Sequence, residues 1–69
     1  MKKEMPIRML RRKVVEEITG LSRSSIYARM EAGTFPCAVN LGGRVVGWIE
    51  SEVISWVHQK IAAREVRRR

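Results

Sequence analysis

Apolar residues recur along this chain with two different periods, and the change of period separates helical segments from an extended one. Val14, Ile18 and Leu21 are spaced by four and three residues, which is the spacing of an amphipathic helix. Gly20 interrupts the pattern, and glycine readily adopts the left-handed conformation that ends many helices. The pattern therefore predicts a first helix over about residues 11–19.

A second helical pattern begins only a few residues later. Ser22 can accept hydrogen bonds from the exposed amides of a first turn, so it is the expected N-cap. Ile26 and Met30 form the apolar stripe of this helix, which should run to about Ala32 and end at Gly33. Two helices joined by a tight turn that contains glycine are typical of a helix-turn-helix.

Beyond the second helix the apolar period approaches two residues, which is typical of β-strands. An alternating segment over residues 38–41 and an extended segment over residues 44–49 flank Gly42-Gly43. Two such segments predict a β-hairpin whose turn is this glycine pair. A two-stranded hairpin is barely stable alone, so we expect it to pack on the helices with Trp48 as its anchor.

A third helix is predicted after the hairpin. Its apolar face would be formed by Val53, Trp56, Val57 and Ile61. The acidic residues at its start suit the positive end of a helix dipole. Glu50 or Ser51 is the expected cap, and the helix should end between Ala63 and residues 67–69.

The predicted order is helix, helix, two-stranded wing, helix, which is a mainly α fold with a small β-hairpin: a winged helix-turn-helix. We expect the DNA-binding domain to span residues 10–64, between a flexible basic arm at residues 1–9 and a basic C-terminal tail at residues 65–69. In such a fold the wing and the second helix can engage neighbouring grooves of one duplex.

The length and composition of the chain limit the kinds of site that it can form. A chain of 69 residues forms one small domain with a thin core, which buries roughly 60% of the unfolded surface. Cys37 and His58 are each alone of their kind, so no disulfide and no structural zinc site can form within one chain. A catalytic Cys–His pair is conceivable, but nothing supplies a third, orienting group. We therefore expect no enzyme activity, metal, cofactor or small-molecule substrate.

The hydropathy pattern also argues against a membrane partner. No apolar run approaches the ~18 residues that a membrane-spanning helix needs. The basic first residues are not followed by the apolar segment of a signal peptide. The expected location is cytoplasmic and nucleoid-associated.

The net charge of +7 makes a polyanion the first partner to consider. Six of the 14 Lys and Arg residues lie within residues 1–13 and five lie within residues 60–69, so the basic character is concentrated at the two ends. Solubilising tails are an alternative explanation of the same pattern.

The second helix offers the candidate reading surface. With Ile26 and Met30 toward the core, the helical rotation of about 100° per residue turns Ser24 away from the core. The same rotation places Arg23 and Arg29 on opposite edges of the helix. A helix that enters a major groove by its N-terminus brings its first residues to base edges and its free amides to phosphate.

Several of these residues also have a purely structural interpretation. Serines at a helix start are capping residues in many proteins. Tyr27 could pack against the first helix with only its hydroxyl in water, and Arg44 could be a solvated turn residue. The sequence leaves these alternatives open.

Three stretches together resemble a known family. The stretches "LSRSSIY", "GTFP" and "VNLGGRVVGWIESEVISWV" are similar, in this order and spacing, to the AlpA-type phage and prophage regulators. These belong to the MerR/excisionase-like winged helix-turn-helix superfamily, and the resemblance covers about residues 10–64. It implies a sequence-specific transcriptional regulator of a prophage or integrated element that binds double-stranded DNA and acts near integrase or excision genes.

The resemblance extends to individual positions. The recognition helix is matched by Ser22, Arg23, Ser24, Ser25 and Tyr27, with Arg29 beside them, and the wing by Gly42, Gly43 and Arg44. We expect base edges to be read by Arg23, Ser24, Ser25 and Tyr27. We expect phosphates to be held by Arg11, Arg12, Arg23, Arg44, Arg67, Arg68 and Arg69.

The chain also departs from the family pattern. Ala28, Cys37 and Asn40 stand where the family often has basic residues, which removes potential phosphate contacts from the helix and the wing. The basic ends of the chain could compensate for these losses.

Two other functions remain open at this point. An excisionase-type factor would use the same fold to bend DNA. A protein-interaction module with non-specific DNA affinity would use the third helix, including Trp56, as an oligomer or partner surface. The partners to consider are double-stranded DNA, further copies of the chain on DNA, and an integrase or RNA polymerase.

Overall fold

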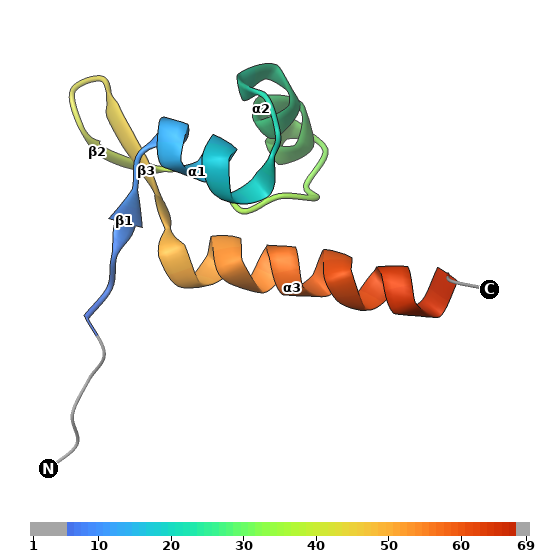
Figure 1. Cartoon of the computed structure of the whole chain (residues 1–69). Helices are drawn as coiled ribbons and strands as arrows, with labels where there is room; N and C mark the ends of the chain where they lie inside the picture. The colour runs from blue at the N-terminus through green and yellow to red at the C-terminus, as the bar shows by residue number, and fades with distance from the viewer. Residues whose placement is uncertain (1–5, 68–69) are drawn as a thin grey trace, which may run out of the picture.

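The computed structural model describes the backbone of residues 6–67 and the side chains of residues 6–64. Its elements, in chain order, are β1 (Met9–Leu10), α1 (Arg12–Thr19), α2 (Arg23–Glu31), β2 (Val39–Gly42), β3 (Val45–Ile49) and α3 (Glu50–Arg67). The pair α1–α2 lies on one side of α3, and the small sheet lies at one end of this stack (Figure 1). The predicted fold class, a mainly helical winged helix-turn-helix, is confirmed.

The end of α1 and the start of α2 have the glycine stop and the serine cap that the sequence predicts. Gly20 ends α1 with a left-handed φ of 76°, and its amide donates to the Glu16 carbonyl at 2.7 Å. Ser22 has an extended backbone and caps α2, because its hydroxyl accepts a hydrogen bond from the Ser25 amide at 3.2 Å. Both the predicted stop and the predicted cap are confirmed.

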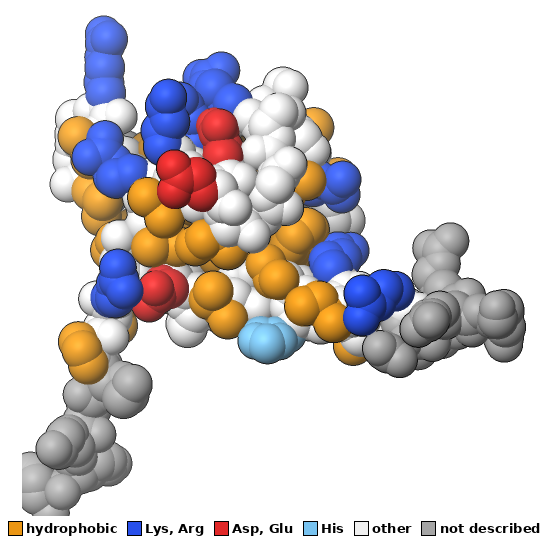
Figure 2. All heavy atoms as spheres, viewed as in Figure 1, with side chains coloured by type: hydrophobic (Ala, Val, Ile, Leu, Met, Phe, Trp, Pro, Cys, Tyr) orange, Lys and Arg blue, Asp and Glu red, His pale blue; other side chains and the backbone are white. Residues whose placement is uncertain are grey.

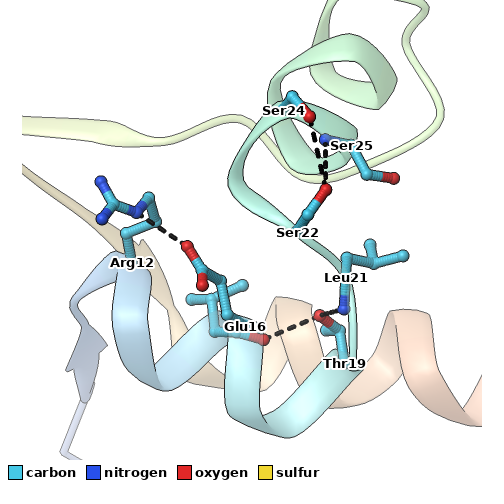
Figure 3. Close-up of polar contacts among 8 residues, drawn as sticks. Arg12, Glu16, Thr19, Leu21, Ser22, Ser24 and Ser25 are labelled. Atoms are coloured by element: carbon cyan, nitrogen blue, oxygen red, sulfur yellow. Dashed lines mark hydrogen bonds and ion pairs between the residues drawn. The ribbon is translucent and has the colours of Figure 1, made fainter.

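The side chain of Thr19, which no pattern in the sequence marks, fixes the turn between these helices. The Thr19 hydroxyl donates to the Val15 carbonyl at 2.8 Å and accepts from the Leu21 amide at 3.1 Å, as Figure 3 shows. This side chain therefore ties the chain beyond the turn back to the last turn of α1. It helps to set the direction in which α2 leaves.

The sheet has one strand more than predicted. β1 pairs antiparallel with β3, with Met9 opposite Ile49 and Leu10 opposite Trp48, so the strand order is β1-β3-β2. The Glu50 amide extends this pairing by donating to the Arg8 carbonyl at 2.8 Å. The predicted arm at residues 1–9 overlaps this pairing at residues 8 and 9, because a two-residue strand shows no periodicity in the sequence. The free edge of β3 is what orders them.

The predicted turn of the hairpin is also shifted by one residue. Gly42 pairs with Val45, so the turn is made by Gly43 and Arg44 rather than by the glycine pair. The register shifts between Asn40 and Gly42, and the Asn40 side-chain oxygen accepts from the Gly42 amide at 2.7 Å. Gly42 and Gly43 both have positive φ, which glycine adopts without a steric penalty.

The core collects side chains from nearly every element. It is formed by Leu10, Val15, Ile26, Phe35, Trp48 and Val53, all of them buried. Trp48 is fully buried and its indole N–H donates to the Pro36 carbonyl at 3.1 Å, so its predicted role as anchor is confirmed. On α1 the buried centre is Val15, whereas Val14 is 39% exposed. The predicted stripe of Val14, Ile18 and Leu21 is therefore wrong at Val14, because packing of α1 against β3 buries the neighbouring Val15 instead.

The long helix α3 is only partly covered. Val53 is buried, Trp56 and Val57 are half-buried, and Ile61 is 46% exposed, so the predicted apolar face packs only along its first half. Beyond that point α3 runs out past the body of the molecule (Figure 1). Within the described part of the chain, no helix has the length and apolar character needed to cross a membrane.

Candidate nucleic-acid interface

A basic cleft lies where the starts of α1 and α2 meet the hairpin. It encloses about 270 Å³ and is lined by Arg11, Arg12, Lys13, Arg23, Tyr27, Arg44 and Val46. Three separate elements thus place five cationic side chains around one hollow. Figure 2 shows Lys and Arg side chains gathered along the side of the molecule opposite α3.

The positive charge of the cleft is only slightly neutralised from within. Arg12 donates through Nε to Glu16 at 2.9 Å, an i,i+4 pair on α1 that Figure 3 shows. Among the side chains of residues 6–64, Arg12 is the one cleft cation with a carboxylate partner. The other four charges are therefore left to attract an anion from outside.

The backbone adds to this positive potential, because α1 and α2 both begin at the cleft. Neither helix has an acidic residue in its first turn. At the start of α2 the amides of Ser25 and Ile26 bond to Ser22, whereas those of Arg23 and Ser24 have no acceptor in the described part of the chain. Free amides at the positive end of a helix dipole are a ready site for phosphate.

Tyr27 connects the cleft with the core. The Arg23 guanidinium lies over the Tyr27 ring, with Cζ 5.2 Å from the ring centroid. The same ring also meets Trp48 edge-on, with centroids 6.2 Å apart and planes at 74°. Tyr27 is 37% exposed, so it faces both the core and the cleft.

The three serines at the start of α2 differ in their hydrogen-bond partners and in their exposure to solvent. Ser22 is occupied as the cap, and its hydroxyl lies 3.4 Å from that of Ser24, as Figure 3 shows. Ser24 is exposed. Ser25 is half-buried, and its hydroxyl accepts from Arg29 Nε at 3.2 Å. Ser22 therefore caps the helix, and Ser24 is the exposed serine that does not; none of the three lines the cleft.

Not all of the predicted residues lie at the cleft. The cleft includes Arg11, Arg12, Arg23, Tyr27 and Arg44, but Arg29 is held by Ser25 on the other edge of α2 and does not line it. Gly42 and Gly43 shape the wing without lining the cleft. The side chain of Arg67, and all of Arg68 and Arg69, lie outside the described residues.

Two further residues line the cleft that were not predicted to do so. Lys13 follows directly on Arg11-Arg12, so the run of three cations at a helix start was the signal for it. Val46 lies on β3, and no pattern in the sequence marked it as facing the helices.

A second hollow, on another part of the surface, has a different character. This groove of about 810 Å³ runs between residues 33–39 and the first half of α3, and Glu52 is the one charged residue along it in the described part of the chain. Phe35 and Trp56 meet edge-on there, with centroids 4.9 Å apart. No group of three metal-ligating side chains occurs among the described residues.

One family model and two known proteins match most of the chain. The family model described as prophage CP4-57 regulatory protein (AlpA) matches residues 8–61. The chain is 47% identical over 58 residues to uncharacterized protein ORF88 of Enterobacteria phage P4, which covers 84% of this chain and 66% of that protein. It is 39% identical over 61 residues to the DNA-binding transcriptional activator AlpA of Escherichia coli (strain K12), which covers 78% of this chain and 86% of that protein.

Proposed function

The chain belongs to the AlpA family of prophage regulatory proteins, and we propose that it is a sequence-specific transcriptional regulator that binds double-stranded DNA. In this proposal it serves a prophage or integrated element and acts near integrase or excision genes. The relative in E. coli is named a DNA-binding transcriptional activator, which supports the proposal.

The observation that carries the proposal is the convergence of charge on the cleft. Five cations from α1, α2 and the hairpin surround one hollow, and residues at the starts of both short helices line it. A DNA duplex carries one phosphate charge for about every 1.7 Å of its axis. A surface of this kind therefore suits a duplex whose backbone crosses the cleft. Arg11, Arg12, Lys13 and Arg44 are the proposed phosphate contacts.

Sequence discrimination is assigned to the first residues of α2. Arg23 and Ser24 are exposed at the helix start, and Ser25 and Tyr27 lie beside them. An arginine that bonds to both acceptors of guanine in the major groove contributes about 1–3 kcal/mol of discrimination. Arg23 is thus the proposed main reader, and Ser24 the proposed second one. Phosphate contacts from Arg67, Arg68 and Arg69 remain a prediction.

The test is a binding-site selection followed by a titration. A random duplex pool is selected on the full chain, and fluorescence anisotropy then compares the selected duplex with its scrambled version across a salt series. We expect a preference of about 10³-fold or more near physiological salt. Equal binding to both duplexes, with affinity that collapses as salt rises, would overturn the proposal.

A matched pair of variants separates the cleft from general charge. Arg44→Ala removes one cation from the cleft, and Lys60→Ala removes one cation from α3, where Lys60 lies over the Trp56 ring. Losing one phosphate contact lowers the slope of log affinity against log salt by about 0.9. We expect that change for Arg44→Ala only. An equal change in both variants would show that net charge, not the cleft, holds the DNA.

Contacts beyond DNA are a second part of the proposal. Ile54 and Ile61 are exposed apolar residues on α3, and neither lines the cleft. This exposure supports contacts of α3 with another copy on DNA, an integrase or RNA polymerase. Sedimentation of the chain with and without a duplex that carries two sites measures the self-association. The same duplex, with the site moved along it, reports DNA bending by gel mobility, as the excisionase-type alternative requires.

A further inference from the structure

The side chain of Arg23 contacts an aromatic ring of its own helix. Its guanidinium lies over the ring of Tyr27, one helical turn further along α2, with Cζ 5.2 Å from the ring centroid. Arginine stacks on aromatic faces and is attracted by the negative face of the ring. Arg23 has no carboxylate partner among the residues that the structure describes, so this ring is its main support.

The ring of Tyr27 is itself supported by the core. It meets Trp48 edge-on at 6.2 Å, and Trp48 is fully buried. The Trp48 indole in turn donates to the Pro36 carbonyl at 3.1 Å, so it cannot rotate freely. A continuous series of contacts thus leads from the fixed centre of the molecule to the guanidinium of Arg23.

We propose that Tyr27 is a positioning residue, whose ring holds the Arg23 guanidinium in the orientation that reads the base edge. This inference rests on the proposed function and assigns Tyr27 a role through Arg23 instead of a base contact of its own. A guanidinium stacked on a ring keeps its in-plane N–H donors available for two parallel hydrogen bonds. Because the guanidinium is already oriented, less side-chain freedom is lost on binding.

This role predicts different results for two substitutions. Tyr27→Leu removes the ring, and Tyr27→Phe keeps the ring but removes the hydroxyl. A cation–π contact of ordinary strength corresponds to about threefold to thirtyfold in an equilibrium constant. We expect Tyr27→Leu to lower the preference for the selected duplex over its scrambled version by that factor. We expect Tyr27→Phe to retain the preference within about twofold. An equal loss in both variants would overturn the proposal, because the hydroxyl would then be the contacting group.

A double-mutant cycle tests whether Tyr27 acts through Arg23. The preference for the selected duplex is measured for Arg23→Ala, for Tyr27→Leu and for the double variant. If the ring acts only by holding Arg23, Tyr27→Leu has no further effect once Arg23 is alanine. Two independent losses that add in the double variant would overturn the proposal. Absence of any preference in the unsubstituted chain would instead refute the proposed function.

A measurement on the free protein keeps the inference testable without DNA. Ring currents of Tyr27 should shift the side-chain proton resonances of Arg23 upfield in the NMR spectrum. We expect this shift to persist in Tyr27→Phe and to disappear in Tyr27→Leu, while the Trp48 indole resonance stays dispersed and reports an intact fold. Arg23 resonances that are unchanged in Tyr27→Leu would show that the ring does not hold the guanidinium.

Discussion

The first turn of α3 and the first turns of α1 and α2 carry side chains of opposite charge. α3 has Glu50 and Glu52 in its first turn, where carboxylates favour the positive end of the helix dipole. α1 and α2 have no acidic residue in their first turns, and cations are present there instead. The start of α3 is thus complemented within the chain, whereas the starts of α1 and α2 are not.

We infer that the acidic start of α3 stabilises the fold, whereas the cationic starts of α1 and α2 serve to bind an anion. A cation near the positive end of a helix is unfavourable by about 0.3–1 kcal/mol at an exposed position. The cleft concentrates this unfavourable arrangement, and Glu16 relieves it at Arg12. An external anion would relieve the rest. Cations at a helix start that have no carboxylate partner can therefore indicate a surface that binds an anion.

The largest expected effect comes from the cation at the start of α2. Arg23→Ala should weaken binding to the selected duplex by about 1–3 kcal/mol, because the base contact is lost. Binding to a scrambled duplex should fall much less, since one phosphate contact at most is removed. Anisotropy titrations on both duplexes measure the two losses. Equal losses would mean that Arg23 holds phosphate only.

The next effect should have opposite signs for binding and for stability. Lys13→Glu places a carboxylate in the first turn of α1, as in α3, and should raise the free energy of unfolding by about 0.3–1 kcal/mol. It should also lower the affinity for DNA about tenfold near physiological salt and reduce the salt slope by about 1.8. Thermal unfolding and a salt series measure both. A variant that is less stable and binds DNA unchanged would break the comparison between the helix starts.

Two substitutions of Ser22, the N-cap of α2, separate the effect of the capping hydrogen bond on stability from the effect of charge on DNA binding. Ser22→Ala removes the acceptor of the Ser25 amide and should lower the free energy of unfolding by about 1 kcal/mol. Ser22→Asp keeps an acceptor and adds an anion, so it should restore the stability and weaken DNA binding. Urea unfolding gives the first quantity and anisotropy the second. DNA binding that is unimpaired by Ser22→Asp would argue against phosphate near this helix start.

The smallest effect is expected at the start of α3. Glu52→Gln removes one favourable charge from the helix dipole and should lower the free energy of unfolding by roughly 0.3–1 kcal/mol. Glu52 lines the groove between residues 33–39 and α3 and not the cleft, so DNA affinity and the salt slope should stay unchanged. A slope that rises in this variant would show that DNA approaches α3 instead.

Much of the fold follows from local chemistry in the sequence. Gly20, Ser22 and Gly33 act where glycine and serine were expected to end and to cap helices, and the buried Trp48 anchors the hairpin. These predictions succeed because each depends on one or two residues and on the backbone next to them. The third strand, at Met9–Leu10, could not be predicted in this way. Its pairing with β3 joins residues about forty positions apart.

The candidate site was predictable in composition but not in arrangement. Five of the predicted residues line the cleft, because a helix start and a hairpin tip are local features. The sequence did not show that Arg29 would be held by Ser25, nor that Tyr27 would lie between Arg23 and Trp48. The contacts of Arg29 with Ser25 and of Arg23 with Tyr27 join residues four apart on α2, so the spacing allows them without requiring them. The contact of Tyr27 with Trp48 depends on how α2 is rotated against the sheet. Tertiary packing determines that rotation.

The most direct test of the cleft as the DNA-binding surface is an NMR titration of the ¹⁵N-labelled chain with the selected duplex. We expect the largest changes at the amides of Lys13, Arg23, Ser24 and Arg44, and little change at those of Phe35 and Trp56, which line the groove beside α3. Changes confined to the two ends of the chain, or centred on α3, would contradict this expectation, because the cleft would then have no part in holding the duplex.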